Sequence, residues 1–253
     1  MIAITYIGHA TTLIEIDGFN ILTDPNFSKR VLLLKRHGAI NFDPGKLPEL
    51  SAVLISHAHH DHLDINSFRY IKGSVPVFVP KGLGHFVGKF IRNPVIELKH
   101  WGGHTLPNGL DITATDAKHI GFRWLPIRFR NTNGYVISTK NARVFFAGDT
   151  RYGSHFKEIA RIFGEQPPID VALMPIGGYS PKWLMQGFHM NPNEALEAFL
   201  DTGARHMVPI HFGTFRLSAE KLKEPVESLS RLAIERELGE RVHILNSGET
   251  FKS

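Results

Sequence analysis

The sequence predicts an α+β fold in which two β-sheets are sandwiched between helices. The chain of 253 residues alternates between groups of short strand patterns and amphipathic helix patterns, and it does so twice. Hydrophobic residues make up 42% of the chain, so it can bury a large core. Because each sheet must cover its apolar face with another layer, two such series imply two sheets with helices outside them. No stretch is typical of a long linker, and we therefore expect a single domain over residues 1–253.

The first series contains five strand patterns and two helix patterns. The run 52–55 is continuously apolar, which is typical of a buried strand. Leu63, Ile65, Phe68 and Ile71 follow a helical spacing. Strands are expected near residues 2–7, 11–16, 20–23, 52–56 and 76–79, and helices near 62–72 and 82–91.

The second series contains six strand patterns and three helix patterns. The stretch 110–117 alternates between apolar and polar residues, as a half-buried strand does. Asn191 and Pro192 mark a helix start, because proline is favoured at the first helical position. Strands are expected near residues 110–117, 134–139, 143–147, 169–174, 207–210 and 242–246, and helices near 153–163, 192–202 and 218–236.

A dense cluster of possible metal ligands follows the apolar run at 52–55. Residues 57–62 read His-Ala-His-His-Asp-His. On an extended backbone His57 and His59 project to the same side, so their two imidazole nitrogens can meet one ion. Asp61 and His62 would lie on the first turn of the helix expected at 62–72 and face elsewhere, which suggests a second ion. Nitrogen and carboxylate ligands without thiolate suit zinc, manganese or iron.

Two coordination shells need more ligands than this cluster offers. Three polar residues stand at the carboxyl ends of short apolar runs, namely His119, Asp149 and His211. One histidine or aspartate at such a position is usually a turn or capping residue. Together with residues 57–62, the three form a candidate ligand set for two metal ions.

The His-x-His-x-Asp-His cluster with its later histidines and aspartate resembles the metallo-β-lactamase superfamily of dinuclear metal hydrolases. Further motifs resemble the branch that contains N-acyl-phosphatidylethanolamine-hydrolysing phospholipase D, and they cover nearly the whole chain. These motifs are Gly8-His9-Ala10-Thr11, Leu22-Thr23-Asp24-Pro25, Val53-Leu54-Ile55-Ser56-His57, Phe145-Phe146-Ala147-Gly148-Asp149-Thr150, Pro175-Ile176-Gly177, the stretch 179–185 with His189 and 191–195, and Pro209-Ile210-His211-Phe212-Gly213-Thr214. The resemblance implies a four-layer αβ/βα sandwich with the metals at one edge.

The resemblance also implies a role for each candidate ligand. His57, His59 and His119 would hold the first ion, Asp61, His62 and His211 would hold the second, and Asp149 would bridge them. Two ions about 3.5–4 Å apart can share a carboxylate and a water, and the bridging hydroxide is the expected nucleophile. Asp61 is in addition a catalytic candidate, placed to orient the nucleophile or to move its proton. Zinc is the expected metal, with manganese or iron as alternatives.

Positions at which this sequence differs from related branches of the superfamily restrict the reactions that it could catalyse. A glutamate in place of His59 would resemble the di-iron type, so His59 favours hydrolysis over redox chemistry. The chain contains no cysteine, which excludes the thiolate-ligated second site of several β-lactamases. The ligand set alone would equally suit a thioester hydrolase or a nuclease.

The motifs outside the ligand set favour a phosphodiesterase that acts on a phospholipid-like or other small phosphodiester. The first alternative is a lactonase resembling the ascorbate-phosphate lactonase branch. A nuclease ranks third, because the chain has no appended domain of the kind found in RNA-processing members. A non-catalytic metal-binding scaffold is the alternative from outside the enzyme class.

His189 is the best catalytic candidate outside the metal ligands. It precedes the helix expected at 192–202, where a histidine is often merely a capping residue. The resemblance places such a histidine at the substrate pocket. There its imidazole could hold a phosphate oxygen or protonate a leaving alkoxide.

The net charge of +5 and the pI near 9.4 suit nucleic acid, an anionic membrane or an ordinary soluble surface. Residues 27–36 flank four aliphatic residues with two basic pairs, as a loop that dips into a membrane interface would. Residues 121–130 interleave aromatics with arginines, a pattern that can bind lipid headgroups or single-stranded nucleic acid. For each segment, a subunit interface or a packed lid is the structural alternative.

The first residues lack the basic start of a signal peptide, and no apolar run approaches the roughly 18 residues of a membrane span. A cytoplasmic location is expected, with peripheral membrane contact as an option. A lipid or small-molecule phosphodiester is the expected partner rather than a nucleic acid. No sequence feature specifies an oligomeric state.

Overall fold

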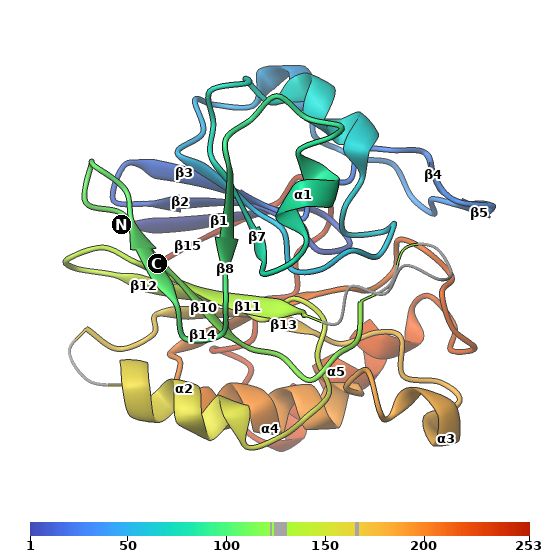
Figure 1. The fold of residues 1–253 in the computed structure, drawn as a ribbon. Coiled ribbons are helices and arrows are strands. Elements are labelled where there is room, and N and C mark those ends of the chain that lie inside the picture. The colour runs from blue at the N-terminus through green and yellow to red at the C-terminus, as the bar shows by residue number, and fades with distance from the viewer. Residues whose placement is uncertain (122, 124–130, 165–166) are drawn as a thin grey trace.

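The computed structural model describes residues 1–121, 123, 131–164 and 167–253. Two large sheets are stacked face to face, and helices cover their outer faces (Figure 1). The predicted α+β sandwich of two sheets between helices is therefore confirmed. Among the described residues, no helix combines the length and apolar character needed to cross a bilayer.

The first sheet has seven strands and combines an antiparallel half with a parallel half. Strands β15, β1, β2 and β3 pair antiparallel, and β3, β6, β7 and β8 pair parallel. In spatial order the strands are β15 (Thr250–Lys252), β1 (Ile2–Gly8), β2 (Thr11–Ile16), β3 (Phe19–Thr23), β6 (Ala52–Leu54), β7 (Val77–Pro80) and β8 (Val95–Leu98).

The second sheet has six strands, and its parallel part lies at the end formed by β14, β13 and β12. The remaining strands pair antiparallel. In spatial order they are β14 (His206–Ile210), β13 (Val171–Pro175), β12 (Arg143–Phe146), β11 (Asn133–Ser138), β10 (Asp111–Asp116) and β9 (Gly103–Thr105). A separate two-stranded hairpin is formed by β4 (Arg30–Val31) and β5 (Leu34–Lys35).

The helices form the two outer layers. Below the second sheet in Figure 1 lie α2 (His155–Phe163), α4 (Pro192–Thr202) and α5 (Glu224–Glu235). The first sheet is covered by shorter turns, namely the 3₁₀ helices at Pro44–Lys46 and Ile65–Tyr70 and helix α1 (Gly84–Val87). The single-turn helix α3 (Lys182–Met185) projects beyond α4 and α5. Helix α4 starts as the sequence predicts, because Asn191 and Glu194 form a capping box around Pro192.

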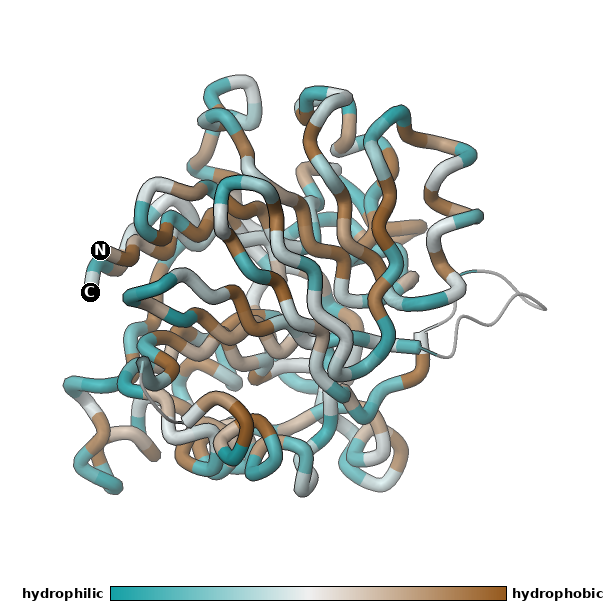
Figure 2. Tube along the Cα trace, turned by 60° about the vertical axis from the view of Figure 1, so that its left-hand side comes forward, coloured by the Kyte–Doolittle hydropathy of each residue, from teal (hydrophilic) through white to brown (hydrophobic). Residues whose placement is uncertain are grey.

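The central core lies between the two sheets. Ile4 and Ile14 of the first sheet and Tyr135, Phe146 and Ile210 of the second are fully buried members of one apolar cluster. Two further clusters join each sheet to its helices. Figure 2 shows the same distribution, with hydrophobic stretches along the inner strands and hydrophilic residues in the outer turns. Burial of these side chains is the main term that holds the four layers together.

Three predicted elements were wrong in type or extent. The helix expected at 62–72 is a 3₁₀ helix at Ile65–Tyr70, because the Asp64 side chain accepts a hydrogen bond from the backbone N–H of Asn66 and starts it late. The helix expected at 82–91 is only the turn Gly84–Val87, since glycines stand at both of its ends. No strand forms at 242–246, where Val242 makes an isolated bridge to Met207.

Other predictions missed or misplaced short elements. Strands β8, β9 and β15 and helix α3 were not predicted, and each has only three or four residues. The helix expected at 218–236 begins at Glu224, with Pro225 in its first turn. Most of the aromatic and basic segment 121–130 lies outside the described residues.

Candidate metal centre

The predicted ligands meet at one edge of the sandwich, where strands of both sheets end. The carboxyl ends of parallel strands point to the same edge of a sheet, and residues that directly follow them are brought together there. The contributing segments are His9 after β1, residues 57–62 after β6, His119 after β10, Asp149 after β12 and His211 after β14. The seven residues predicted as ligands all belong to clusters whose possible ligand atoms lie within 4.8 Å of one another.

The first cluster contains His57, His59, His119 and Asp149. His59 Nδ1 lies 2.8 Å from His57 Nε2 and 3.2 Å from His119 Nε2. Three imidazole nitrogens and a carboxylate oxygen at such spacing suit a tetrahedral ion such as Zn²⁺. This grouping is the one that the family resemblance implied for the first ion.

The second cluster contains Asp61, His62 and His211, together with His9. Asp61 Oδ2 lies 3.5 Å from His62 Nε2 and 3.7 Å from His211 Nε2. Asp61 and His62 lie in a turn in which the backbone N–H of His62 donates to the carbonyl of His59, and not on the first turn of a helix as predicted. The turn still separates them from His57 and His59.

Asp149 lies between the two clusters. Its Oδ2 is 3.1 Å from His62 Nε2, 3.2 Å from His211 Nε2 and 3.7 Å from His57 Nε2. Gly148, with φ of +60°, turns the chain so that the carboxylate enters the site. A Cβ at Gly148 would lie 2.6 Å from the Cβ of Ser56, so only glycine fits there.

Several polar atoms at this centre are buried without a hydrogen-bond partner in the described part of the chain. They are both carboxylate oxygens of Asp149 and Nε2 of His62 and His211, which approach one another as ion pairs at 3.1 and 3.2 Å without hydrogen-bond geometry. An unpaired buried polar group costs about 1–3 kcal/mol, so this arrangement is unfavourable unless something else satisfies these atoms. Because the atoms converge on one region, a pair of divalent cations would satisfy them together, and the donor set fits such ions.

The carboxylates of the centre are held in their ionised form. Burial alone would raise the pKa of Asp149, but the charges of His211 and His62 hold it well below its usual range. The pKa of Asp61 is likewise well below its usual range, since His62 and hydrogen bonds from histidines outweigh burial. Ionised carboxylates are the form that binds a cation.

Asp24 contacts the side of His62 that faces away from Asp149, and it was not predicted as a site residue. Its fully buried carboxylate accepts hydrogen bonds from the backbone N–H and the hydroxyl of Ser56 at 2.7 and 2.6 Å. The same carboxylate lies 2.6 Å from His62 Nδ1 and directs Nε2 of that ring toward Asp149. A similar contact joins His119 Nδ1 to the carbonyl oxygen of Phe188 at 3.0 Å. Such contacts fix the orientation of imidazole ligands.

Replacing Asp24 with asparagine is expected to weaken metal binding by about 10- to 100-fold, because His62 loses the carboxylate that orients it. Competition with a chromophoric chelator measures this affinity. Asp43→Asn is a matched control, since the exposed Asp43 caps a 3₁₀ turn at Pro44–Lys46. Wild-type affinity in a folded Asp24→Asn protein would remove Asp24 from the centre.

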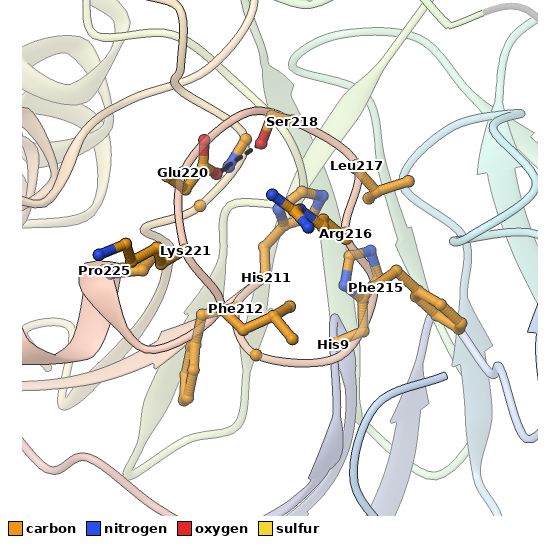
Figure 3. A pocket seen from close by; sticks show the side chains of 14 residues that line it. His9, His211, Phe212, Phe215, Arg216, Leu217, Ser218, Glu220, Lys221 and Pro225 are labelled. Carbon is orange, nitrogen blue, oxygen red and sulfur yellow. Dashed lines mark hydrogen bonds between the residues drawn. The ribbon is translucent and has the colours of Figure 1, made fainter. Parts of the chain in front are cut away.

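His9, which belongs to the motif Gly8-His9-Ala10-Thr11, is a second supporting residue of the centre. The backbone of His9 has φ of +58°, and its N–H donates hydrogen bonds to the hydroxyl groups of Tyr6 and Thr214. This fixed backbone places Nε2 at 2.9 Å from Asp61 Oδ2 and the ring centroid 4.1 Å from that of His211. Figure 3 shows the two imidazoles close together beside the loop that carries residues 211–222. His9 therefore positions the carboxylate of Asp61.

His189 lies at the rim of the centre. Its Nδ1 is buried without a hydrogen-bond partner among the described residues and lies 3.9 Å from Asp149 Oδ2. Burial, together with the neighbouring histidines, lowers its pKa to about 3, so the imidazole is neutral at pH 7. His60 is the member of the 57–62 cluster that turns away, with Nε2 3.2 Å from the carbonyl oxygen of Arg123.

A cavity of about 510 Å³ opens onto these residues. Its polar lining consists of His59, His60, Asp61, Arg123, Asp149, His189 and His211. The apolar part of the lining is the larger one and comes from residues 31–34, Met185 and Leu217. A cavity of this kind suits a substrate with an apolar part beside the reacting group.

A family model described as "Beta-lactamase superfamily domain" matches residues 19–212, which is well over half of the chain. This chain belongs to the β-lactamase superfamily. The metallo-β-lactamase fold protein YhfI from Bacillus subtilis aligns over the whole of both chains, with a TM-score of 0.69 and 18% identity. The predicted metallo-β-lactamase fold is thus confirmed.

Two curated relatives align with most of this chain. N-acyl-phosphatidylethanolamine-hydrolyzing phospholipase D 1 from Caenorhabditis elegans is 34% identical over 253 residues, covering 92% of this chain and 70% of the relative. An uncharacterized protein from Mycobacterium tuberculosis is 36% identical over 243 residues, covering 90% of this chain. The chain spans only 63% of the length of that mycobacterial relative.

Proposed function

We propose that this chain is a dinuclear metal-dependent hydrolase that cleaves a phospholipid-like or other small phosphodiester. The position of Asp149 carries the proposal. Its buried carboxylate lies within 3.7 Å of ligand nitrogens from both clusters, and its closest polar contacts are those imidazole nitrogens. A carboxylate that bridges two ions accounts for this geometry. Zinc fits the nitrogen-rich donor set, and manganese or iron are alternatives.

His57, His59 and His119 would hold one ion, Asp61, His62 and His211 the other, and Asp149 both. Two bound ions would lower the pKa of a shared water and balance the charge on the reacting phosphoryl oxygens. Asp61, whose Oδ2 lies 2.9 Å from His9 Nε2, would orient that water and accept its proton. His189 lines the same cavity and, as a neutral imidazole, would donate a hydrogen bond to a phosphate oxygen.

The cavity walls support an amphipathic substrate. Leucines at 32–34 and 217 and Met185 surround the approach to His189 and Asp61. The Caenorhabditis elegans relative is named for hydrolysis of N-acyl-phosphatidylethanolamine, which is a lipid phosphodiester. A phosphodiester with an apolar portion fits both observations.

The substrate class is tested by comparing bis(p-nitrophenyl) phosphate with a phosphorylated lactone. We expect turnover of the phosphodiester and little opening of the lactone, measured on the same zinc-loaded sample. The reverse preference would support the lactonase, which uses the same ligand set on a cyclic ester. Hydrolysis of neither substrate, nor of a thioester, at full metal occupancy would support a scaffold.

A further inference from the structure

The hairpin β4–β5 carries exposed leucines to the mouth of the cavity. Leu32 and Leu33 form its tip, and the Leu33 side chain is 90% exposed. The base of the hairpin is fixed, because Arg36 donates hydrogen bonds to the carbonyl oxygens of Ser28 at 3.0 Å and Asn26 at 2.6 Å. The exposed tip is thus held in place by the fold.

Two local features of this hairpin are unfavourable in water. Leu32 has φ of +52°, a conformation for which a hairpin turn normally uses glycine or asparagine. Arg30 and Lys35 lie directly opposite each other across the two strands, and like charges in such a pair destabilise a hairpin. A hairpin of two strands is marginal even without these costs. Apolar contact at the tip and an anionic partner at the strands would offset both.

A second apolar projection borders the same cavity as the hairpin. Helix α3 exposes Trp183, whose side chain is 78% exposed, and Leu184. Met185 at the end of α3 lines the same cavity as residues 31–34, so both projections border one opening. They project on the same side of the molecule, at the right of Figure 1.

Both projections are basic within their own segments, while Asp64 contacts Ser28 at the base of the hairpin and Glu220 contacts the backbone of Ser180 ahead of α3. Residues 27–38 contain Lys29, Arg30, Lys35 and Arg36 and no acidic residue, and residues 180–190 contain Lys182 and no acidic residue. Exposed leucine and tryptophan side chains flanked by lysine and arginine are typical of protein segments that lie in the headgroup region of an anionic bilayer.

We propose that the hairpin tip and α3 together dock this protein on an anionic phospholipid bilayer, with the cavity mouth facing the membrane. The inference rests on the proposed function, because docking in this orientation would let a lipid phosphodiester enter the cavity directly from the bilayer. A second copy of the chain fits the face less well. A twofold interface would bring the basic residues of the two copies together, and like charges that meet in this way oppose association.

Sedimentation with lipid vesicles tests the proposal without requiring turnover, so it can be interpreted even if the hydrolase proposal fails. We expect binding to phosphatidylcholine vesicles that contain phosphatidylglycerol, and binding at least about tenfold weaker without the anionic lipid. Leu33→Glu and Trp183→Glu should each lower the affinity by about tenfold or more. Ile234→Glu is the matched control, because Ile234 is 75% exposed on α5 and does not line the cavity.

A charge reversal separates membrane binding from a structural role of the hairpin. Lys35→Glu places opposite charges across from Arg30 and should stabilise the hairpin, yet it should weaken vesicle binding by about fivefold. Thermal unfolding of each variant checks that the fold is intact. Equal binding by wild type and variants, or no binding of wild type to anionic vesicles, would overturn the proposal. A dimer that Leu33→Glu disrupts, without vesicle binding, would instead assign this face to self-association.

Discussion

Replacing Asp149 with asparagine is expected to abolish the dinuclear centre and to lower phosphodiester turnover by about 10³-fold or more, or about 4 kcal/mol. The carboxylate lies between Nε2 of His57, His62 and His211, and an amide of the same shape cannot supply its charge to two ions. Metal content should fall from about two ions per chain to one or none. Elemental analysis and initial rates on the same preparation measure both effects.

Asp170→Asn is the matched control for this experiment. Asp170 is also a buried aspartate, but it accepts hydrogen bonds from the backbone of Arg143 and the side chain of Arg205 far from the ligands. We expect its substitution to lower stability and to leave metal content unchanged. Two ions and wild-type turnover in Asp149→Asn would contradict a bridging role for this residue.

His189→Ala is expected to retain both metals and to lose at least tenfold in turnover, with about 10²-fold as the central expectation. His189 lines the cavity and forms a third possible ligand group with Asp149 and His211, but it is not one of the seven residues implied as ligands of the two ions. The substitution removes the imidazole N–H that would donate a hydrogen bond to the substrate, whereas the ions keep the ligands implied for them. Steady-state rates and metal content separate these effects.

Two further variants sharpen this prediction. His189→Gln restores an N–H donor, so it should recover more activity than alanine if the imidazole acts by hydrogen bonding. His243→Ala is a control, because His243 contacts His206 and Phe251 away from the cavity. Unchanged turnover in His189→Ala would remove this residue from the site, because Asn191 and Glu194 already cap α4.

The convergence of the candidate ligands could be predicted because histidine and aspartate residues stand at the ends of several strands. His57 and His59 are adjacent to a buried strand, and Asp149 and His211 each follow another, so strand order alone brings them to one edge. The two supporting residues were harder to assign. Asp24 and His9 act through hydrogen bonds to His62 and Asp61, which are 38 and 52 residues away along the chain. Single-sequence patterns carry no information on such pairings.

The errors in the fold have a related cause. The helical spacing from Leu63 to Ile71 reflects burial of one face, but Asp64 caps a 3₁₀ helix there. Strands such as β15 have only three residues and form because β1 offers a free edge. Their stability comes from tertiary pairing, which overrides weak local propensity. The segment 27–36 was singled out by its pattern of apolar and basic residues, but the hairpin that it forms at Arg30–Lys35 was not predicted.

The most direct test of a dinuclear hydrolase is the metal content of the purified protein, paired on one sample with turnover of bis(p-nitrophenyl) phosphate before and after chelation. We predict about two ions per chain, loss of turnover on chelation and recovery on adding zinc. One ion or none after reconstitution, or full occupancy without turnover, would contradict the account.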